Sequence, residues 1–380
     1  MSLPTHRTHE PRLQQIALAR QAVLHDGKSM SRTGTPAWVE RSWQRCLASG
    51  KRPDEKVSFA MIAPNAMRVL EGKHRALLQT ARPVLQSLAH AIASTRYFAI
   101  LTNAQGVVID AHGAIDRSDR RADLITRIGT DLSEDALATT AIGAALSELQ
   151  PIWLHKGEHF YDANAVYSCA GAPLFGPDGA CIGMLDLTGI DTAERPELKH
   201  LVAQSARSIE NALTVGQLKT DADLLIRLNW PGRTLGDETD GLVCLNRDGY
   251  VTAANQMARM LLPQLSAWAA DQHASDLFAM PLDMLFDAAR RQSSKTALDV
   301  PLWTGLRLHA MPLMGFQSGG LACAQLPVPP GPALPLKDIE TALIRQAVDE
   351  ARGNVQKAAK ALGISRATVY RRLGAMSKRS

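Results

Sequence analysis

The chain has 380 residues, of which 46% are hydrophobic and 21% charged, with a formal net charge of +5. This length exceeds what one compact core usually accommodates, so we expect two or three domains of a soluble globular protein. No apolar run approaches the roughly 18 residues of a membrane span, and the polar N-terminus lacks the apolar core of a signal peptide. The five cysteines are scattered, which favours reduced thiols in the cytoplasm over a disulfide framework.

Positive charge is concentrated at the C-terminal end of the chain. Residues 337–380 contain ten lysines and arginines against four aspartates and glutamates, a net of +6, so the rest of the chain sums to −1. A basic segment beside a nearly neutral remainder is typical of a nucleic-acid-binding domain.

The first 74 residues are predicted to form a helical region. Trp38, Trp43 and Cys46 fall on a helix predicted at residues 36–48. We expect these side chains to pack against the next domain or a second subunit rather than to form a site of their own.

The middle of the chain is predicted to form two α+β sensor domains, at residues 75–220 and 221–326. Strand–turn–strand patterns whose turns end in glycine predict hairpins at residues 97–113, 171–189 and 240–258. The predicted helices lie at residues 76–95, 140–148 and 198–219, and a further helix begins near Asn255. Sheets flanked by helices in this order indicate an α+β multidomain protein.

The C-terminal segment, residues 337–380, is predicted to be an all-α helix-turn-helix. The proline-rich residues 327–336 indicate a semi-rigid linker before it. Gly363 supplies a turn after the helix predicted at residues 355–362, and Ser365 caps the helix that follows. A capped, basic second helix of this kind enters the major groove of DNA.

The residues predicted to bind DNA differ in role. Arg366 and Thr368, at the start of the second helix, are best placed to meet base edges. The side chains expected to hold phosphates, which position the helix without reading sequence, are Lys357, Tyr370, Arg371 and Arg372. The complete predicted set is Lys357, Ser365, Arg366, Thr368, Tyr370, Arg371 and Arg372.

Several segments resemble a known family of bacterial regulators. The run GNVQKAAKALGISRATVYRRL resembles the C-terminal helix-turn-helix of Fis-type regulators. The segment from IGTDLSEDALATTAIG to CIGMLDLTG, with the upstream VERSWQRCLASGKRPDE, resembles the GAF-domain region of the acetoin-catabolism regulator family. Residues 222–326 look like a PAS-type domain, and Ala138-Thr139-Thr140 stands where the family usually has Gly-Thr-Asn. The resemblance implies a homodimer that reads a palindromic operator in double-stranded DNA.

The resemblance also exposes an absence. Family members commonly carry an AAA+ ATPase that remodels polymerase bound to sigma-54, and this module needs a G-x-x-x-x-G-K-[ST] loop. No Gly-Lys pair of the chain has the preceding glycine and the following hydroxyl. We therefore expect no cofactor, no ATP hydrolysis and no direct sigma-54 remodelling, so that any activation uses ordinary contacts with RNA polymerase, DNA architecture or steric exclusion.

An aromatic cluster in the first sensor domain is the candidate effector site. In GAF domains this region lines the cavity over the sheet, so a small organic molecule would lie against the aromatic side chains. The predicted effector-binding residues are Trp153, His155, Phe160, Tyr161 and Cys169. The alternative left open is that Trp153 and Phe160 are core residues and the histidines are satisfied on the surface.

Two chemical readings of the same region are disfavoured. His155, His159 and Cys169 lack a fourth metal ligand, so no metal is expected. Cys169 and Cys181 are candidate thiols of a GAF-type methionine sulfoxide reductase, but the apolar strand around Cys181 predicts a buried, inert thiol. We expect no catalytic residue and no enzyme. The other alternative is a constitutive or architectural DNA-binding protein whose sensor domains serve dimerisation or protein partners.

Overall fold

The computed structural model describes residues 9–27, 35–62, 72, 74–219, 222–267, 272–291, 297–314 and 355–356. The chain divides into two compact units, Met1–Gly319 and Gly320–Ser380. The predicted linker at residues 327–336 and all seven predicted DNA-binding residues lie outside the described residues.

The first domain is built on a five-stranded antiparallel sheet in the order β2-β1-β5-β4-β3. The hairpins predicted at residues 97–113 and 171–189 are both present, and the turn of the second contains Gly179 with a φ of +84°, which glycine adopts without strain. The strands are β1 (Tyr97–Asn103), β2 (Val108–Gly113), β3 (Ile152–His155), β4 (Tyr167–Phe175) and β5 (Cys181–Ile190).

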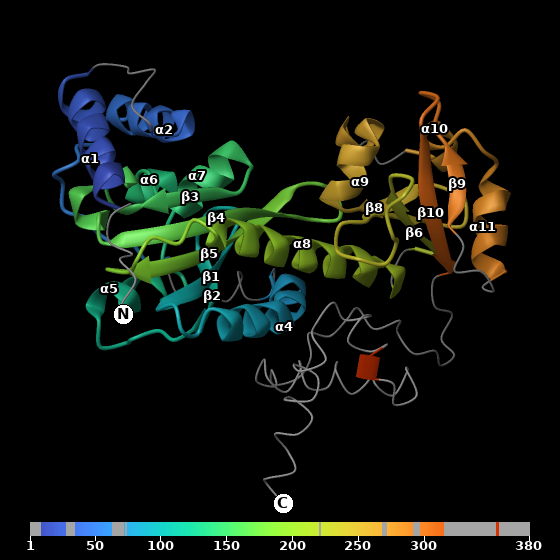
Figure 1. Ribbon diagram of the computed structural model, residues 1–380, viewed down its shortest axis with the longest axis horizontal. Coiled ribbons are helices and arrows are strands. Elements are labelled where there is room, and N and C mark those ends of the chain that lie inside the picture. Colours follow the sequence, from blue (N-terminus) through green and yellow to red (C-terminus); the bar gives the residue numbers. More distant parts are fainter. Residues whose placement is uncertain are drawn as a thin grey trace, which may run out of the picture. The chain divides into compact units, whose positions relative to one another are not determined.

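Helices cover both faces of this sheet (Figure 1). One face packs against α4 (Arg75–Ala91) and α8 (Leu198–Gly216). The other face lies under α2 (Ala37–Ala48), α6 (Glu134–Leu137) and α7 (Ala141–Glu148). The remaining helical segments are α1 (His9–Arg20), the π-helix Gln21–His25, α5 (Arg120–Ile125) and the short 3-10 turns Lys156–Glu158, Asp162–Asn164 and Gln217–Lys219.

The helices predicted in the first 220 residues are present with small changes at their ends. Thr140 is the N-cap of α7 rather than its first residue, because its hydroxyl accepts a hydrogen bond from the backbone of Gly143. The helix predicted at residues 198–219 ends at Gly216 and continues as a 3-10 turn. Trp43 and Cys46 are buried in the same hydrophobic core as the sheet, which confirms that α2 packs on the following domain.

The second sheet is also five-stranded and antiparallel, in the order β8-β7-β6-β10-β9. The predicted β7–β8 hairpin is present, and Asn255 caps the helix after it by accepting a hydrogen bond from the backbone of Ala258. The remaining three strands had no predicted counterpart. The elements are β6 (Leu224–Asn229), β7 (Gly241–Leu245), β8 (Val251–Ala254), α9 (Gln256–Leu261), the 3-10 turn Pro263–Ala267, α10 (Ala274–Leu277), α11 (Leu282–Arg290), β9 (Leu298–Pro301) and β10 (Arg307–Met314). Both domains are therefore α+β.

Direct hydrogen bonds join the first domain to the second. The backbone N–H of Ala254 and the guanidinium of Arg259 both donate to the carbonyl oxygen of Pro177, at 2.8 and 3.0 Å. On α8, the side chain of Asn211 accepts from Asn255 at 2.7 Å. The β4–β5 turn and the second half of α8 therefore contact the end of β8 and the helix α9 that follows it.

Candidate functional site

A small cavity of about 40 Å³ lies in the first domain, between the sheet and the helices α5–α7. A water molecule occupies roughly 10–15 Å³ on this measure, so the space suits a molecule of a few heavy atoms. Strands β1, β4 and β5 contribute to its floor. Its apolar lining consists of Phe59, Ile100, Ile125, Leu132, Leu137, Ala141 and Ile142.

The polar lining is concentrated on β4 and β5. Cys169 pairs with Thr188 in the β4–β5 register, and strand alternation places Asp186 on the same face as Thr188. The hydroxyl of Thr188 donates to Oδ2 of Asp186, and Sγ of Cys169 lies 3.4 Å from the same hydroxyl and 3.7 Å from Nε2 of His159. These four side chains form a polar row, which we call the polar floor. Thr140, Asn164 and Tyr167 complete the polar lining.

Burial determines the charge of the polar floor. Burial raises the pKa of Asp186 to about 7 and raises the pKa of the Cys169 thiol well above its usual value. Burial also lowers the pKa of His159 to about 4, so its ring is neutral at physiological pH and Nδ1 donates to the carbonyl oxygen of Lys156 at 2.9 Å. The lining contains no lysine or arginine among the described residues. The cavity therefore presents no cation at neutral pH.

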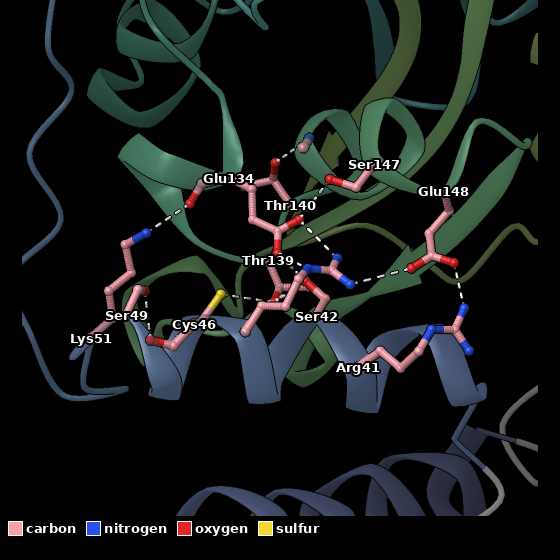
Figure 2. Close-up of polar contacts among 12 residues, drawn as sticks. Arg41, Ser42, Cys46, Ser49, Lys51, Glu134, Thr139, Thr140, Ser147 and Glu148 are labelled. Carbon is pink, nitrogen blue, oxygen red and sulfur yellow. Dashed lines mark hydrogen bonds and ion pairs between the residues drawn. The ribbon is translucent and has the colours of Figure 1, made fainter.

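The roof of the cavity is held from outside by α2 (Figure 2). Nε of Arg45 donates to Glu134 at 2.9 Å, and the guanidinium of Arg41 forms an ion pair with Glu148. Between these ion pairs, the hydroxyl of Ser42 lies 2.7 Å from that of Thr139, in the turn that joins α6 to α7. The polar contacts of α2 thus fix the segment that supplies Leu137, Thr140, Ala141 and Ile142 to the cavity.

The α6–α7 turn contains a strained residue. Ala138 ends α6 with a φ of +56° and a ψ of −147°, and it is fully buried. This backbone region is essentially restricted to glycine, and a non-glycine residue in it costs about 1–3 kcal/mol. Ala138 stands where the resembled family usually has glycine, so the departure seen in the sequence is also a local backbone strain.

A second set of contacts fixes the loop that carries His159 and Asn164. The guanidinium of Arg20 donates to the carbonyl oxygens of Gly157 and Phe160, at 2.8 and 3.0 Å, and lies 5.8 Å from the Trp43 ring. Nε1 of Trp43 donates to the carbonyl oxygen of Glu158 at 2.9 Å. The N-terminal helices therefore hold one wall of the cavity.

Comparison with known proteins identifies the family. Residues 15–211, more than half of the chain, match the model of the MimR N-terminal domain, and residues 335–376 match the Fis family of bacterial regulatory proteins. The chain belongs to the MimR N-terminal domain family. The cavity and the helices that hold it lie within the matched residues, and we refer to residues 15–211 as the MimR-type domain.

Characterised relatives are transcription regulators. The chain is 30% identical over 254 residues to the acetoin catabolism regulatory protein of Cupriavidus necator, an alignment covering 64% of this chain and 36% of the relative. It is 27% identical to the propane 2-monooxygenase operon transcriptional activator MimR of Mycolicibacterium goodii, covering 54% of this chain and 34% of the relative. The chain thus spans about a third of the length of the curated relatives it matches.

Among solved structures, the DhaR(N) chain of the Escherichia coli DhaR(N)–DhaL complex is similar over 73% of this chain and 99% of that one, with 14% identity and a TM-score of 0.45. In the part of this chain that the structure describes, no helix is both long and apolar enough to cross a membrane.

The placement of the predicted effector residues requires a correction. Of the five, only Cys169 lines the cavity. Trp153 and His155 lie on the opposite sheet face, because strand alternation in β3 turns Ile152 and Leu154 toward the cavity side. Trp153 packs in the core under α4 and α8, and Nδ1 of His155 lies 2.8 Å from the hydroxyl of Ser168.

Phe160 and Tyr161 are core residues on the cavity side, but they do not line the cavity. Their rings meet edge to face at 5.4 Å within the core that includes the N-terminal helices. The alternative stated above, that Trp153 and Phe160 are core residues, is confirmed by their burial. It is wrong in placing the histidines on the surface, since His155 and His159 are both buried and hydrogen-bonded.

The two candidate thiols are far apart. In the β4–β5 register Cys169 pairs with Thr188 and Cys181 pairs with Phe175, six residues along β4. At about 3.3 Å per residue the two thiols are roughly 20 Å apart, too far for a disulfide. Cys181 is partly exposed, which corrects the expectation of a buried thiol. Within the described ranges, no group of three or more histidine, cysteine, aspartate or glutamate side chains is placed to hold a metal ion.

Sequence reasoning missed the most informative cavity residues, Asp186 and Thr188. The sequence did contain a pattern that indicates both residues. In the run MLDLTG, polar Asp186 and Thr188 alternate with Leu185 and Leu187, so two polar side chains face one side of a strand that is otherwise apolar.

Proposed function

We propose that the chain is a DNA-binding transcription regulator that senses a small organic molecule in the cavity of its MimR-type domain. The observation that carries the proposal is the presence, in one chain, of a Fis-family regulatory segment and a cavity in a separate α+β domain. The first sheet domain acts as a GAF-type sensor, residues 221–326 as a PAS-like domain, and residues 337–380 as the DNA-binding end.

The names of the relatives support the type of effector. Two of them regulate acetoin catabolism and a propane 2-monooxygenase operon, which are both pathways of small oxygenated or oxidisable carbon compounds. A cavity of about 40 Å³ with a mainly apolar lining suits a small alcohol or ketone. The effector of this chain is accordingly a small uncharged catabolic compound.

Effector binding changes where two copies of the helix-turn-helix are held. The proposed homodimer reads a palindromic operator, so a change in the relative position of its halves alters DNA affinity. Coupling of about 1–3 kcal/mol between the two sites is enough, provided that the effector prefers one dimer arrangement. The hydrogen bonds from Ala254 and Arg259 to Pro177 in the β4–β5 turn connect the strands of the cavity floor to the second domain, so a change at the cavity can be transmitted to it. Regulation proceeds without ATP hydrolysis.

The DNA-binding half of the proposal is tested with operator DNA from the promoter region of the gene itself. Fluorescence anisotropy is measured over a salt series for the wild type and for an Arg366→Ala, Arg371→Ala double variant. We expect specific affinity that falls steeply with salt and that the double variant abolishes. Lys378→Ala is the matched control and should leave specificity intact. Specific binding that persists in the double variant would contradict the assignment of the second helix.

The sensing half is tested with a panel of small alcohols and ketones. A true effector raises the melting temperature with dose, because it binds the folded state, and it changes operator affinity in the same concentration range. If DNA affinity is independent of every compound and no melting shift occurs, the architectural alternative replaces the sensor.

A further inference from the structure

Asp186, which lines the cavity, has a buried polar atom without a hydrogen-bond partner in the described part of the chain. Asp186 is 1% exposed, and its Oδ2 accepts from the hydroxyl of Thr188. Its Oδ1 is fully buried and has no hydrogen-bond partner among the residues that the structure describes. Leaving a buried acceptor unpaired costs free energy, so such an atom in a cavity calls for an explanation.

The two residues paired directly with Asp186 in the sheet offer Oδ1 no side-chain donor. In the sheet register Asp186 lies between Ile100 on β1 and Gly171 on β4, and neither has a side chain that can form a hydrogen bond. A larger residue at Gly171 would crowd this place, because a Cβ atom there would lie 1.9 Å from Cε at the end of the Met184 side chain and 3.2 Å from the carbonyl oxygen of Ala141. The chain therefore leaves the cavity side of Asp186 without an internal partner.

The charge of the lining restricts what can bind at this atom. His159 is neutral, and the described lining has no lysine or arginine, so an anionic ligand would meet Asp186 without a compensating cation. A cationic amine would lose its hydration in a cavity whose roof is formed by Leu137, Ala141 and Ile142, with Asp186 as its one carboxylate partner.

An uncharged hydroxyl group satisfies Oδ1 in either protonation state of the carboxyl group. It donates to an ionised carboxylate, and it accepts from a protonated carboxyl group. A ketone can pair only with the protonated form. A hydroxyl-bearing molecule is therefore the ligand class that best fits the site.

We propose that Asp186 is the specificity-determining residue of the effector site and that its Oδ1 hydrogen-bonds the hydroxyl group of a small uncharged aliphatic alcohol. This inference rests on the sensing function proposed above. Thr188 is a positioning residue, because its hydroxyl holds Oδ2 and thereby orients Oδ1 toward the ligand. The apolar roof then covers the carbon skeleton of the alcohol.

The test uses the full chain and four probes of matched size, namely propylene glycol, lactate, isopropanolamine and acetone. Dissociation constants are measured by calorimetry for the wild type and for Asp186→Leu, which keeps the branched shape of the side chain, is bulkier, and cannot form the hydrogen bond. We expect propylene glycol to bind the wild type more tightly than the other three probes. Asp186→Leu should weaken its binding by about tenfold or more.

Two further variants separate recognition from a purely structural role. Asp186→Asn removes the charge but keeps an acceptor, so it should retain the alcohol and lose part of the discrimination against lactate. Glu210→Gln is the matched control, because Glu210 is another buried carboxyl group, on α8 at the opposite sheet face, where it accepts from the backbone of Phe175 at 2.9 Å. Its alcohol affinity should stay within about twofold of the wild type, well under 1 kcal/mol.

The outcomes distinguish this inference from the proposed function. Tighter binding of lactate, isopropanolamine or acetone would overturn the role of Asp186 and leave the sensor intact. Equal loss of alcohol binding in Asp186→Leu and Glu210→Gln would show a structural effect and overturn it as well. If none of the four probes binds, the inference fails, and the operator assay decides separately whether the chain binds DNA.

Discussion

Two buried aspartates, one in each sheet domain, differ in their partners. Asp240 of the second domain is fully buried and accepts hydrogen bonds from the guanidinium of Arg227 at 3.1 Å, the amide of Asn229 at 3.2 Å and the backbone of Gly236 at 2.6 Å. Asp186 of the MimR-type domain is equally buried but has one partner, Thr188. Burial alone therefore does not distinguish a structural carboxyl group from a ligand-binding one, whereas the set of partners does.

The two domains differ in backbone strain in the same way. Among the described residues, all non-glycine residues with positive φ lie in the first domain, at Arg96, Ala138, Leu149, Lys156 and Asp191. The unpaired Oδ1 of Asp186 and these backbone conformations are thus local costs in the domain with the cavity. Such costs persist where the surrounding structure holds them and where function uses them.

The largest effect is expected where the paired aspartate is removed. Asp240→Ala leaves Arg227, whose side chain is 13% exposed, as an uncompensated buried cation. Breaking such a pair costs about 3–5 kcal/mol. We expect urea denaturation at pH 8 to show this loss for Asp240→Ala and no loss for Asp186→Asn, which removes a buried charge. Equal losses in the two variants would remove the distinction between the two aspartates.

Part of the pH dependence of stability should come from the unpaired carboxyl group of Asp186. Burial raises the pKa of Asp186 from 3.8 to about 7, so its protonated form is favoured by folding. This contribution is complete below the unfolded pKa near 4 and is lost as pH rises through about 7. Unfolding free energy should therefore fall between pH 5 and pH 8, and Asp186→Asn should recover about 2–4 kcal/mol of it at pH 8.

The matched comparison for this titration is Glu210→Gln, because burial also raises the pKa of Glu210 to about 7. Burial also raises the pKa of Glu158 to about 7, so Glu158 contributes to the fall of unfolding free energy with pH in the wild type and in both amide variants. Each amide variant should flatten the profile by a similar amount. A profile that Asp186→Asn leaves unchanged would show that this carboxyl group does not titrate in the expected range.

Features that depend on residues close together in the chain could be predicted from the sequence, whereas features that depend on distant residues could not. Turn glycines, the helix that begins near Asn255 and the packing of Trp43 follow from local chemistry, and the structure confirms them. The family and the DNA-binding segment also follow from local motifs. The pairing of β6 with β10 joins segments about eighty residues apart, which no local pattern shows. The β9–β10 hairpin was missed although its strands are neighbours in the chain and its turn contains Gly305.

The cavity could not be located from sequence for a geometric reason. Alternation in β3 shows that Trp153 and Leu154 face opposite sides, but it does not say which side is enclosed by α7. That depends on the contacts of α2 with Glu134 and Glu148, about ninety or more residues away in the chain. The partner set of Asp186 likewise depends on the register of three strands. The kinds of residue at the site could therefore be predicted from the sequence, whereas the residues that surround them in the fold could not.

An intermediate effect is expected at the wall of the cavity. Arg20→Met keeps an apolar stem under Trp43 but removes the donors to the carbonyl oxygens of Gly157 and Phe160. We expect a loss of about 1–3 kcal/mol and faster hydrogen exchange at residues 156–164. Arg52→Met, at an exposed ion pair with Asp54, is the control and should change stability by less than about 1 kcal/mol. Unchanged exchange in Arg20→Met would show that the loop is held by other contacts.

The smallest effect tests whether Ala138 is strained. Replacing alanine by glycine in a helix costs about 1 kcal/mol in backbone entropy, and loss of a buried methyl group adds about 0.8 kcal/mol. Ala145, fully buried within α7, should show this whole cost. At Ala138 the relief of about 1–3 kcal/mol of strain offsets it, so Ala138→Gly should be close to neutral or stabilising. The measured quantity is the difference in unfolding free energy between the two variants, expected to be at least about 1 kcal/mol. If both variants lose the same stability, the conformation at Ala138 carries no strain, and the contrast between the two domains then depends on Asp186 alone.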